Sequence, residues 1–332
     1  MERIFEAIQE NLPGPKWRSL FQKHWPAYKR WFLSEGDKAR PFYLSSLRAL
    51  RRHMPELLPT YEHLVELAGG SDLAARFLSL YCPPPYVNGC SQAVWPGAEP
   101  LLIRNYDYSP QLFEAVIVNT AWNGRQVIAM SDCLWGVVDG FNEDGLVVSL
   151  TFGGRRVVGD GFGVPILLRY ILEFCTTVAE AMDVLKRVPT HMAYNVTVLD
   201  RGGVFRTAYI GPDRPVLIKP APITTNHQRR VEWHQHAHAT ATLERERFLY
   251  FRLRESGDTP DKLLQAFLHS PVYSTAYRRG FGTLYTAIYR PVTGEAEYRW
   301  PNGGWRQSFK AFEEGTCAVN FPHVPNSLEL LH

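Results

Sequence analysis

A cysteine stands where the character of the sequence changes, within Asn88-Gly89-Cys90-Ser91. Before Gly89 the apolar residues recur at helical spacing, whereas from Cys90 onward they alternate as in a β-strand. A glycine lets the backbone adopt strained geometry, and strain at a peptide bond favours transfer of its acyl group from nitrogen to a neighbouring sulfur. After hydrolysis Cys90 would carry a free α-amine, whose ordinary pKa of about 8 suits a general base. The pattern predicts a nucleophile released by cutting the chain between Gly89 and Cys90.

Two charged residues in the next strand-like run are further candidates for this chemistry. Arg104 and Asp107 lie fourteen and seventeen residues after Cys90, within Leu101-Leu102-Ile103-Arg104-Asn105-Tyr106-Asp107-Tyr108. This run is expected to pair with the strand that begins at Cys90. Taken alone, such residues are more often surface charges of a strand.

The composition is that of an ordinary globular protein. The 332 residues are 45% hydrophobic and 21% charged, enough for one large domain or two smaller ones. The formal net charge is only +3, and Lys and Arg are scattered among nearly as many Asp and Glu. Nucleic-acid binding would need a basic stripe, so we expect no nucleic-acid partner.

The cysteines and the amino terminus indicate a reducing compartment. The five cysteines form no CxxC pair, which argues against disulfides and structural zinc; they are Cys82, Cys90, Cys133, Cys175 and Cys317. The first residues carry acids and lack the apolar core of a secretory signal, and no run approaches eighteen apolar residues. We therefore expect a cytoplasmic protein without membrane association, metal or cofactor.

Residues 2–82 show helical patterns, which predict an all-helical N-terminal segment. The expected helices are a first stripe at 4–12, an aromatic helix at 17–32 that Pro26 could kink, helices within 42–67 interrupted at Pro55 or Pro59, and a helix at 73–80 capped by Ser71-Asp72.

The rest of the chain alternates between groups of strands and pairs of helices. Strands are expected at 90–95, 101–108, 113–122, 126–132, 137–142, 146–152, 193–200, 205–210, 216–225, 283–289 and 296–300, and helices at 166–175, 179–187, 240–255 and 260–268. Hairpin-type turns such as Asp144-Gly145 join many of the strands, so the sheets should be largely antiparallel. Two sheets between two helical layers cover every apolar face, which predicts an α+β protein of four layers, αββα.

Several motifs carry a family resemblance. Asn-Gly-Cys-Ser followed by Arg-Asn-Tyr-Asp-Tyr resembles the acyl-coenzyme A:6-aminopenicillanic acid acyltransferases and, more distantly, the choloylglycine hydrolases and penicillin V acylases. All are N-terminal nucleophile (Ntn) hydrolases of αββα fold. The segments 139–146, 168–173 and 224–227 are also similar, and the aromatic helix around Trp25 and Trp31 looks like the propeptide of the acyltransferases.

The resemblance implies a role for each candidate residue. Gly89–Cys90 would be the autocleavage bond, dividing the chain into a helical propeptide or α-chain at 1–89 and an Ntn-hydrolase β-chain at 90–332. Cys90 would be the nucleophile, with Arg104 favouring its thiolate and Asp107 holding the new α-amine. Asn226 would donate its side-chain NH₂ to the oxyanion, a contact worth roughly 3 kcal/mol.

Two further positions concern the substrate. The choloylglycine hydrolases carry a second active-site asparagine where this chain has Thr151, which favours the acyltransferase branch. The resemblance also implies a late active-site arginine, which would correspond to Arg278 or Arg279 without a fixed alignment. The arginines of Gly153-Gly154-Arg155-Arg156 could serve an acidic substrate or simply end a solvated hairpin.

Several polar residues could have structural roles instead of catalytic ones. An asparagine such as Asn226 is more often a turn residue, and Asn195 is a weaker candidate for the same oxyanion role. His227 could act as the base of a cysteine–histidine pair, although an α-amine makes it unnecessary. The alternating His234, His236 and His238 are expected in a solvated loop rather than at a metal.

The residues and the resemblance together predict a self-cleaving precursor whose two chains, of 89 and 243 residues, stay associated. Through a Cys90 thioester the enzyme would act on a linear, non-peptide amide, with a small-molecule acyl-amide or acyl-coenzyme A as substrate. Water as acceptor gives an amidase and an amine gives an N-acyltransferase; both stay open, as does a homo-oligomer. The alternatives are an unprocessed binding protein and a Cys90/His227 thiol hydrolase that does not cut itself.

Overall fold

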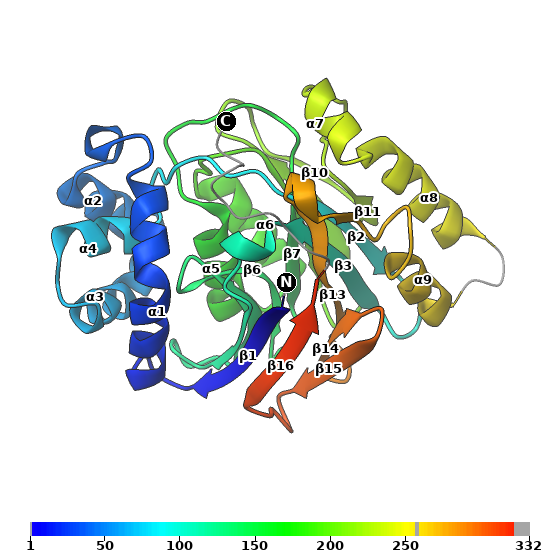
Figure 1. Cartoon of the computed structure of the whole chain (residues 1–332), viewed down its shortest axis with the longest axis horizontal. Coiled ribbons are helices and arrows are strands. Elements are labelled where there is room, and N and C mark those ends of the chain that lie inside the picture. Colours follow the sequence, from blue (N-terminus) through cyan, green and yellow to red (C-terminus); the bar gives the residue numbers. More distant parts are fainter. Residues whose placement is uncertain (1, 256–258, 322–332) are drawn as a thin grey trace.

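Two β-sheets face each other in the middle of the molecule, and helices cover the outer face of each (Figure 1). The computed structural model describes residues 2–255 and 259–321. Helices α1–α4 gather at one end of the sandwich, and α7–α9 lie on the opposite side (Figure 1). The expected α+β fold of four layers, αββα, is confirmed.

The first sheet has nine strands. In spatial order they are β10 (Leu217–Lys219), β9 (Phe205–Ile210), β8 (Tyr194–Leu199), β7 (Val147–Phe152), β6 (Gly136–Asn142), β5 (Val127–Asp132), β4 (Val116–Thr120), β1 (Glu2–Glu10) and β16 (Gly315–Asn320). Neighbouring strands are antiparallel except β1 and β4, which are parallel.

The second sheet has seven strands and carries the candidate nucleophile. Its order is β11 (Ile223–Thr224), β2 (Gly89–Trp95), β3 (Leu101–Tyr108), β13 (Phe281–Arg290), β14 (Glu295–Trp300) and β15 (Gly303–Ser308), while β12 (Thr275–Ala276) pairs with β13. All of these pairings are antiparallel.

The N-terminal segment is helical from Pro15 onward, as expected. Its helices are α1 (Pro15–Phe32), α2 (Tyr43–His53), α3 (Leu58–Leu67) and α4 (Asp72–Leu78). Pro26 lies inside α1 without ending it, whereas a short 3₁₀ turn at Pro55–Leu57 separates α2 from α3. The hydroxyl of Ser71 accepts a hydrogen bond from the amide of Ala74, so the predicted cap of α4 is confirmed.

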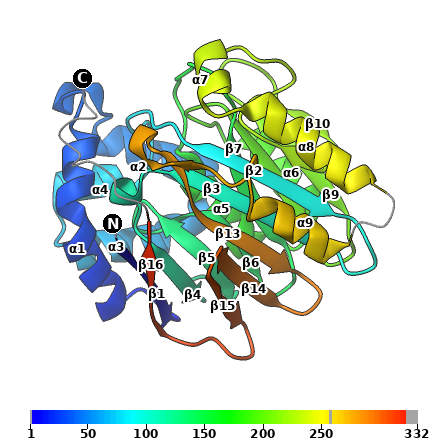
Figure 2. The ribbon, with the colours of Figure 1, turned by 45° about the vertical axis from the view of Figure 1, so that its right-hand side comes forward.

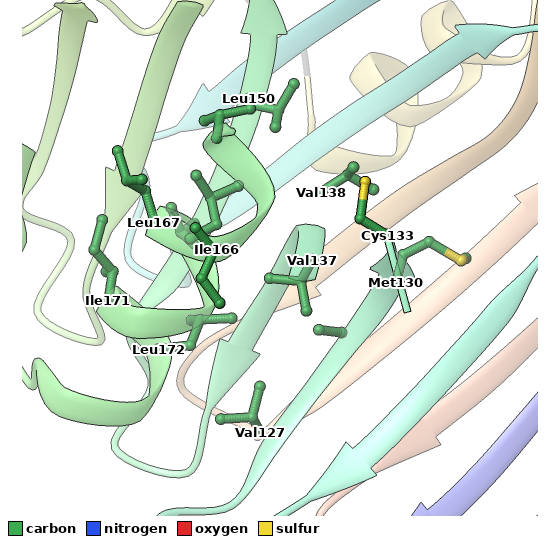
Figure 3. Close-up of a cluster of buried hydrophobic side chains, with 14 of the residues drawn as sticks. Val127, Met130, Cys133, Val137, Val138, Leu150, Ile166, Leu167, Ile171 and Leu172 are labelled. Carbon is green, nitrogen blue, oxygen red and sulfur yellow. The ribbon is translucent and has the colours of Figure 1, made fainter. Parts of the chain in front are cut away.

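The outer helices close both apolar faces of the sandwich. On the nine-stranded sheet lie α5 (Val164–Phe174) and α6 (Val178–Arg187), and Figure 3 shows α5 side chains packed beside Val127, Val137 and Leu150 of that sheet. On the seven-stranded sheet lie α8 (Thr242–Arg254) and α9 (Pro260–Phe267), seen clearly in Figure 2. Leu249 of α8 and Phe267 of α9 pack against Ala93 and Ile103. None of the described helices is long and apolar enough to cross a bilayer.

The structure corrects the expected helix at 4–12. Residues 2–10 form β1, because Phe5 and Ala7 alternate into the core and pair with strands more than a hundred residues away. Phe5 packs against Phe113, Tyr285 and Trp300, which places the amino-terminal strand inside the main core.

The expected strand at 216–225 is also corrected. It is two strands in different sheets, β10 and β11, because Pro220 and Pro222 cannot donate to a ladder. In addition, β15 and β16 follow the two strands expected to be last. The histidines at 234–238 form a helix, α7 (His234–Ala239), instead of a loop, and His236 is buried.

Candidate active site

The pairing of β2 with β3 brings the three predicted residues of these strands together. Cys90 lies opposite Tyr106 and Gly89 opposite Asp107 in this ladder. Because side chains alternate along a strand, Cys90 and Arg104 face the nine-stranded sheet, whereas Asp107 faces helix α8. Charged side chains therefore lie near Cys90 on both faces of the seven-stranded sheet.

The thiol of Cys90 is fully buried beside a guanidinium. Nη2 of Arg104 lies 3.4 Å from Sγ, and Oδ1 of Asn88 lies 3.8 Å from the same sulfur. Burial raises the pKa of the Cys90 thiol, Arg104 lowers it, and Asp107 raises it further. The predicted effect of Arg104 has the expected direction, but in the uncut chain burial outweighs it.

A carboxylate from the opposite sheet holds Arg104 in place. Nη1 of Arg104 donates to Asp139, and at 2.6 Å to the carbonyl of Val138, both on β6. Asp139 also accepts hydrogen bonds from the hydroxyls of Tyr285, at 2.6 Å, and Tyr289. Both members of this ion pair are completely buried. Asp139 is thus a positioning residue that sequence reasoning did not single out.

Asp107 is buried on the side of the sheet that faces α8, opposite Gly89 in the ladder. Its Oδ1 accepts a hydrogen bond of 2.7 Å from the hydroxyl of Thr283, and its Oδ2 accepts one of 3.0 Å from Nη1 of Arg245. Burial raises the pKa of Asp107, while Arg245 and the Thr283 hydroxyl lower it. The carboxylate lies close to Gly89, because a Cβ added to that glycine would lie 3.4 Å from Oδ2.

Asn226 reaches Cys90 from the loop after β11. Its Oδ1 accepts a hydrogen bond of 3.0 Å from the backbone N–H of Cys90 and one of 2.6 Å from Nη2 of Arg245. Its Nδ2 makes a longer contact of 3.4 Å with the carbonyl of Phe152. The structure thus joins Asn226 to Cys90 through its amide oxygen. The donation of its NH₂ group to an oxyanion stays a prediction.

Arg245 of α8 links Cys90, Asp107 and Asn226, and the sequence analysis did not identify it. Its Nη1 lies 2.9 Å from the carbonyl oxygen of Cys90 and 2.7 Å from the hydroxyl of Ser91. Burial lowers the pKa of Arg245, and Asp107 raises it. The spacing of residues in the sequence could have identified it. Arg245 lies with Thr242 and Leu249 on the buried face of its helix, where a cation is unusual.

Thr151 and Asn195 belong to a buried polar network next to the site. The hydroxyl of Thr151 donates at 2.9 Å to the carbonyl of Thr225. The Nδ2 group of Asn195 donates at 3.0 Å to Thr151, to the Thr225 carbonyl and to the His227 carbonyl. These bonds hold the loop that carries Asn226, so both residues contact that loop instead of Cys90.

A cavity of about 610 Å³ opens on the α8 side of the site. Asp107 and Arg245 lie on its wall, together with Tyr273, Tyr277 and Phe281. Arg278 and Arg279 are both exposed on the same wall. The structure therefore places the two late arginines at the cavity and gives Arg245 the direct contacts with Cys90.

The remaining candidates are held by structural contacts. His227 has Nδ1 at 3.1 Å from the hydroxyl of Thr242 and Nε2 at 3.4 Å from Glu246. Arg155 is buried in ion pairs with Asp213 and Glu232, so it is not a solvated hairpin residue.

The alternating histidines show no metal-binding arrangement. Within residues 2–255 and 259–321, no three His, Cys, Asp or Glu side chains are grouped to hold a metal ion. His236 instead stacks on Trp233, with ring centroids 5.0 Å apart.

Comparison with known proteins gives a family match over more than half of the chain. The model of the family "Acyl-coenzyme A:6-aminopenicillanic acid acyl-transferase" matches residues 95–305, a range that includes Arg104, Asp107, Asn226 and Arg245 and begins after Cys90. This confirms the resemblance seen in the sequence. A comparison with curated proteins gives no match.

Three solved structures are similar to this chain at low identity. A mutant of the conjugated bile acid hydrolase from Clostridium perfringens is 12% identical, with 72% of this chain and 99% of that chain covered and a TM-score of 0.47. Penicillin V acylase from Agrobacterium tumefaciens is 13% identical, covering 67% and 86% with a TM-score of 0.46. The Caenorhabditis elegans ortholog of N-acylethanolamine-hydrolyzing acid amidase is 16% identical, covering 61% and 93% with a TM-score of 0.45.

Proposed function

Because this chain belongs to the acyl-coenzyme A:6-aminopenicillanic acid acyl-transferase family, we propose that it is the self-cleaving precursor of an enzyme acting on amide bonds. The nucleophile would be the Cys90 thiol. One observation carries the proposal: the thiol lies 3.4 Å from the Arg104 guanidinium while the backbone nitrogen of the same residue donates to Asn226. A thiol and an amine that must act together are thus both held before the bond between Gly89 and Cys90 is cut.

Self-cleavage would proceed through an acyl shift. The sulfur of Cys90 adds to the carbonyl carbon of Gly89, the bond from that carbon to the Cys90 nitrogen breaks, and the thiol proton passes to the nitrogen. Water then hydrolyses the thioester, leaving a carboxylate on Gly89 and the thiol and a free α-amine on Cys90. The geometry suits this sequence because Asn226 holds the nitrogen and Arg245 holds the Cys90 carbonyl throughout.

The mature site would use the freed α-amine as its base. The amine takes the thiol proton as sulfur adds to the carbonyl of an amide substrate, and it returns the proton to the departing amine. Arg104 favours the thiolate form, and Arg245 orients Asn226 and Asp107 around the amine. Water would then release the acyl group as a free acid, or a second amine would carry it away as a new amide.

Burial of the thiol fits a precursor. Cys90 has no exposed surface, and the segment 83–88 leads directly to it. An added substrate therefore has no path to the sulfur until the Gly89 end is freed. The new carboxylate on Gly89 would lie beside Asp107, in the ladder position that Gly89 now occupies, and that end would no longer be tied to Cys90.

Denaturing mass spectrometry of the wild type beside Cys90→Ala tests the proposal. We expect the wild type to yield two chains that meet between Gly89 and Cys90, and the variant to stay whole. A wild-type chain that remains intact after long incubation contradicts self-cleavage and favours the unprocessed binding protein, because the buried thiol would then stay inaccessible.

A further inference from the structure

A second cavity, of about 130 Å³, lies between α1 and the loop that follows β3. Its walls are largely aromatic: the rings of Tyr28 and Trp31 are 6.2 Å apart, and those of Trp31 and Tyr86 are 6.0 Å apart. Tyr108 and Phe113 line the same cavity. The faces of these rings carry partial negative charge, and their edges carry partial positive charge.

Two carboxylates lie at this cavity, and the hydroxyl of Tyr28 joins them. It donates to Glu114 and, at 3.2 Å, to Asp132. Glu114 also accepts hydrogen bonds from the Ser131 hydroxyl and the Leu134 amide, both at 2.7 Å. In the part of the chain that the structure describes, neither carboxylate forms an ion pair with Lys or Arg. The groups that contact the two carboxylates directly are therefore neutral hydroxyl and backbone N–H donors.

Asp132 has one oxygen that no described residue contacts, and its ionisation is disfavoured where it stands. Burial and the neighbouring Glu114 raise the pKa of Asp132 to about 7. Oδ1 of Asp132 accepts from Tyr28 and from the Cys133 amide at 2.9 Å, whereas Oδ2 receives no donor from any described residue. A cation bound at Oδ2 would favour the ionised form of Asp132, because an opposite charge within a few ångströms lowers the pKa of a carboxyl group.

A neutral histidine completes the lining. Burial lowers the pKa of His24, and its Nε2 is shielded from solvent without a partner among the described residues. In a neutral imidazole one ring nitrogen donates a hydrogen bond and the other accepts one. Asp132 and His24 thus give the cavity two acceptor groups.

We propose that this cavity binds the protonated amino group of a small primary alkylamine. An ammonium has three donors, which suit Oδ2 of Asp132 and other acceptors, and its charge is attracted to the faces of Tyr28, Trp31 and Tyr86. A cavity of about 150 Å³ holds a benzene ring, so the volume here fits an ammonium with a chain of a few carbons. An anion would meet two carboxylates and is excluded.

The position of the cavity connects it to the nucleophile. Tyr106 lies opposite Cys90 in the ladder, and its ring is 5.9 Å from that of Tyr108 on the cavity wall. Tyr86 lies on the same wall, four residues before Cys90. The bound ammonium would thus belong to an amide substrate with an amino group in its acyl or amine part; this assignment to the substrate rests on the proposed function.

Ligand-observed NMR titrations of full-length Cys90→Ala test the site independently of self-cleavage and catalysis. The probes are n-propylammonium, neutral 1-propanol and anionic propionate. We expect n-propylammonium to bind at least tenfold more tightly than either of the others. Equal affinity for the ammonium and the alcohol would overturn the proposal, whether or not the wild type cleaves itself.

Variants locate the binding. Adding Asp132→Asn to Cys90→Ala should weaken n-propylammonium at least tenfold, as should Trp31→Leu, which removes an aromatic wall without touching the carboxylates. Glu244→Gln, at the other cavity, is the matched control and should leave affinity unchanged. Unchanged affinity in a folded Asp132→Asn protein, or a loss in Glu244→Gln, would contradict this location. Denaturant unfolding establishes that each variant is folded.

Discussion

Nη2 of Arg245 lies 2.6 Å from Oδ1 of Asn226, the same oxygen that accepts the backbone N–H of Cys90 at 3.0 Å. The guanidinium therefore determines how Asn226 is turned, since an arginine can only donate. Through its other nitrogen Arg245 also neutralises Asp107. Helix α8 thus orders the surroundings of the future α-amine while the chain is still uncut.

Arg245→Lys should slow self-cleavage at least tenfold. A lysine keeps the charge but lacks the planar fork that reaches Cys90, Asp107 and Asn226 together. Arg245→Met should abolish cleavage and reduce stability by about 3–5 kcal/mol, because Asp107 would remain buried without its partner. Quantifying the two chains by mass spectrometry over time measures the rate, and urea unfolding measures the stability.

The control for this series is Arg247→Lys, an exposed position on the same helix. It should cleave at the wild-type rate. An Arg245→Lys protein that also cleaves at that rate would show that charge alone suffices and that the oriented fork is unnecessary.

Gly89→Ala should slow self-cleavage at least tenfold while the protein stays folded. A methyl group at this position would lie 3.0 Å from Cβ of Asp107, so β2 and β3 must shift apart by a few tenths of an ångström. The shift would move the scissile carbonyl relative to the Cys90 sulfur. Gly303→Ala in β15 is the matched control, because an added methyl there meets nothing within 4 Å. Equal cleavage rates in the two variants would show that the close packing at Gly89 does not affect the rate of self-cleavage.

His227→Ala separates the Ntn mechanism from a cysteine–histidine pair. The His227 ring contacts Thr242 and Glu246, so its loss should cost about 1 kcal/mol of stability and leave self-cleavage within roughly threefold of the wild type. The cleavage assay and urea unfolding give both values. Abolished self-cleavage in a folded His227→Ala protein would instead assign His227 as the base of that reaction and contradict the mechanism in which the α-amine alone is sufficient.

Local patterns predicted much of the fold, and long-range pairing accounts for most of the errors. The strands from Gly89 to Phe152 and helices α5, α6, α8 and α9 follow from alternation, caps and turn residues. The strand at 2–10 was not predicted, because its apolar residues fit either period and its partners lie at the other end of the chain. The short, polar β15 and β16 carry little alternation of their own and depend on neighbouring strands.

The candidate site shows the same division. Cys90, Arg104 and Asp107 could be identified because the ladder of β2 and β3 is local. Asp139 and Arg245 act across layers, so only the buried position of a charged residue hints at them. Asn226 was identified through the family resemblance, but the orientation of its amide depends on Arg245, and no sequence spacing reveals that orientation.

The stability of the uncut protein should fall as the pH rises from about 4 to about 7. The pKa of Asp132 is ordinarily 3.8 and is about 7 in the folded protein, where burial and Glu114 raise it. Between these values the folded protein retains a proton that the unfolded chain releases, so unfolding becomes easier with each pH unit, by up to roughly 1.4 kcal/mol. Below pH 4 both states are protonated, and above pH 7 the loss is complete.

Replacing this carboxylate tests the pH dependence directly. In the Cys90→Ala background, Asp132→Asn should gain up to roughly 4 kcal/mol relative to its parent between pH 4 and pH 8. Urea unfolding at both pH values measures the change, and Asp183→Asn, on the exposed surface of α6, should show none. A parent and an Asp132→Asn protein with parallel pH profiles would mean that Asp132 is ionised in the folded protein at pH 5, which would contradict the raised pKa on which this prediction depends.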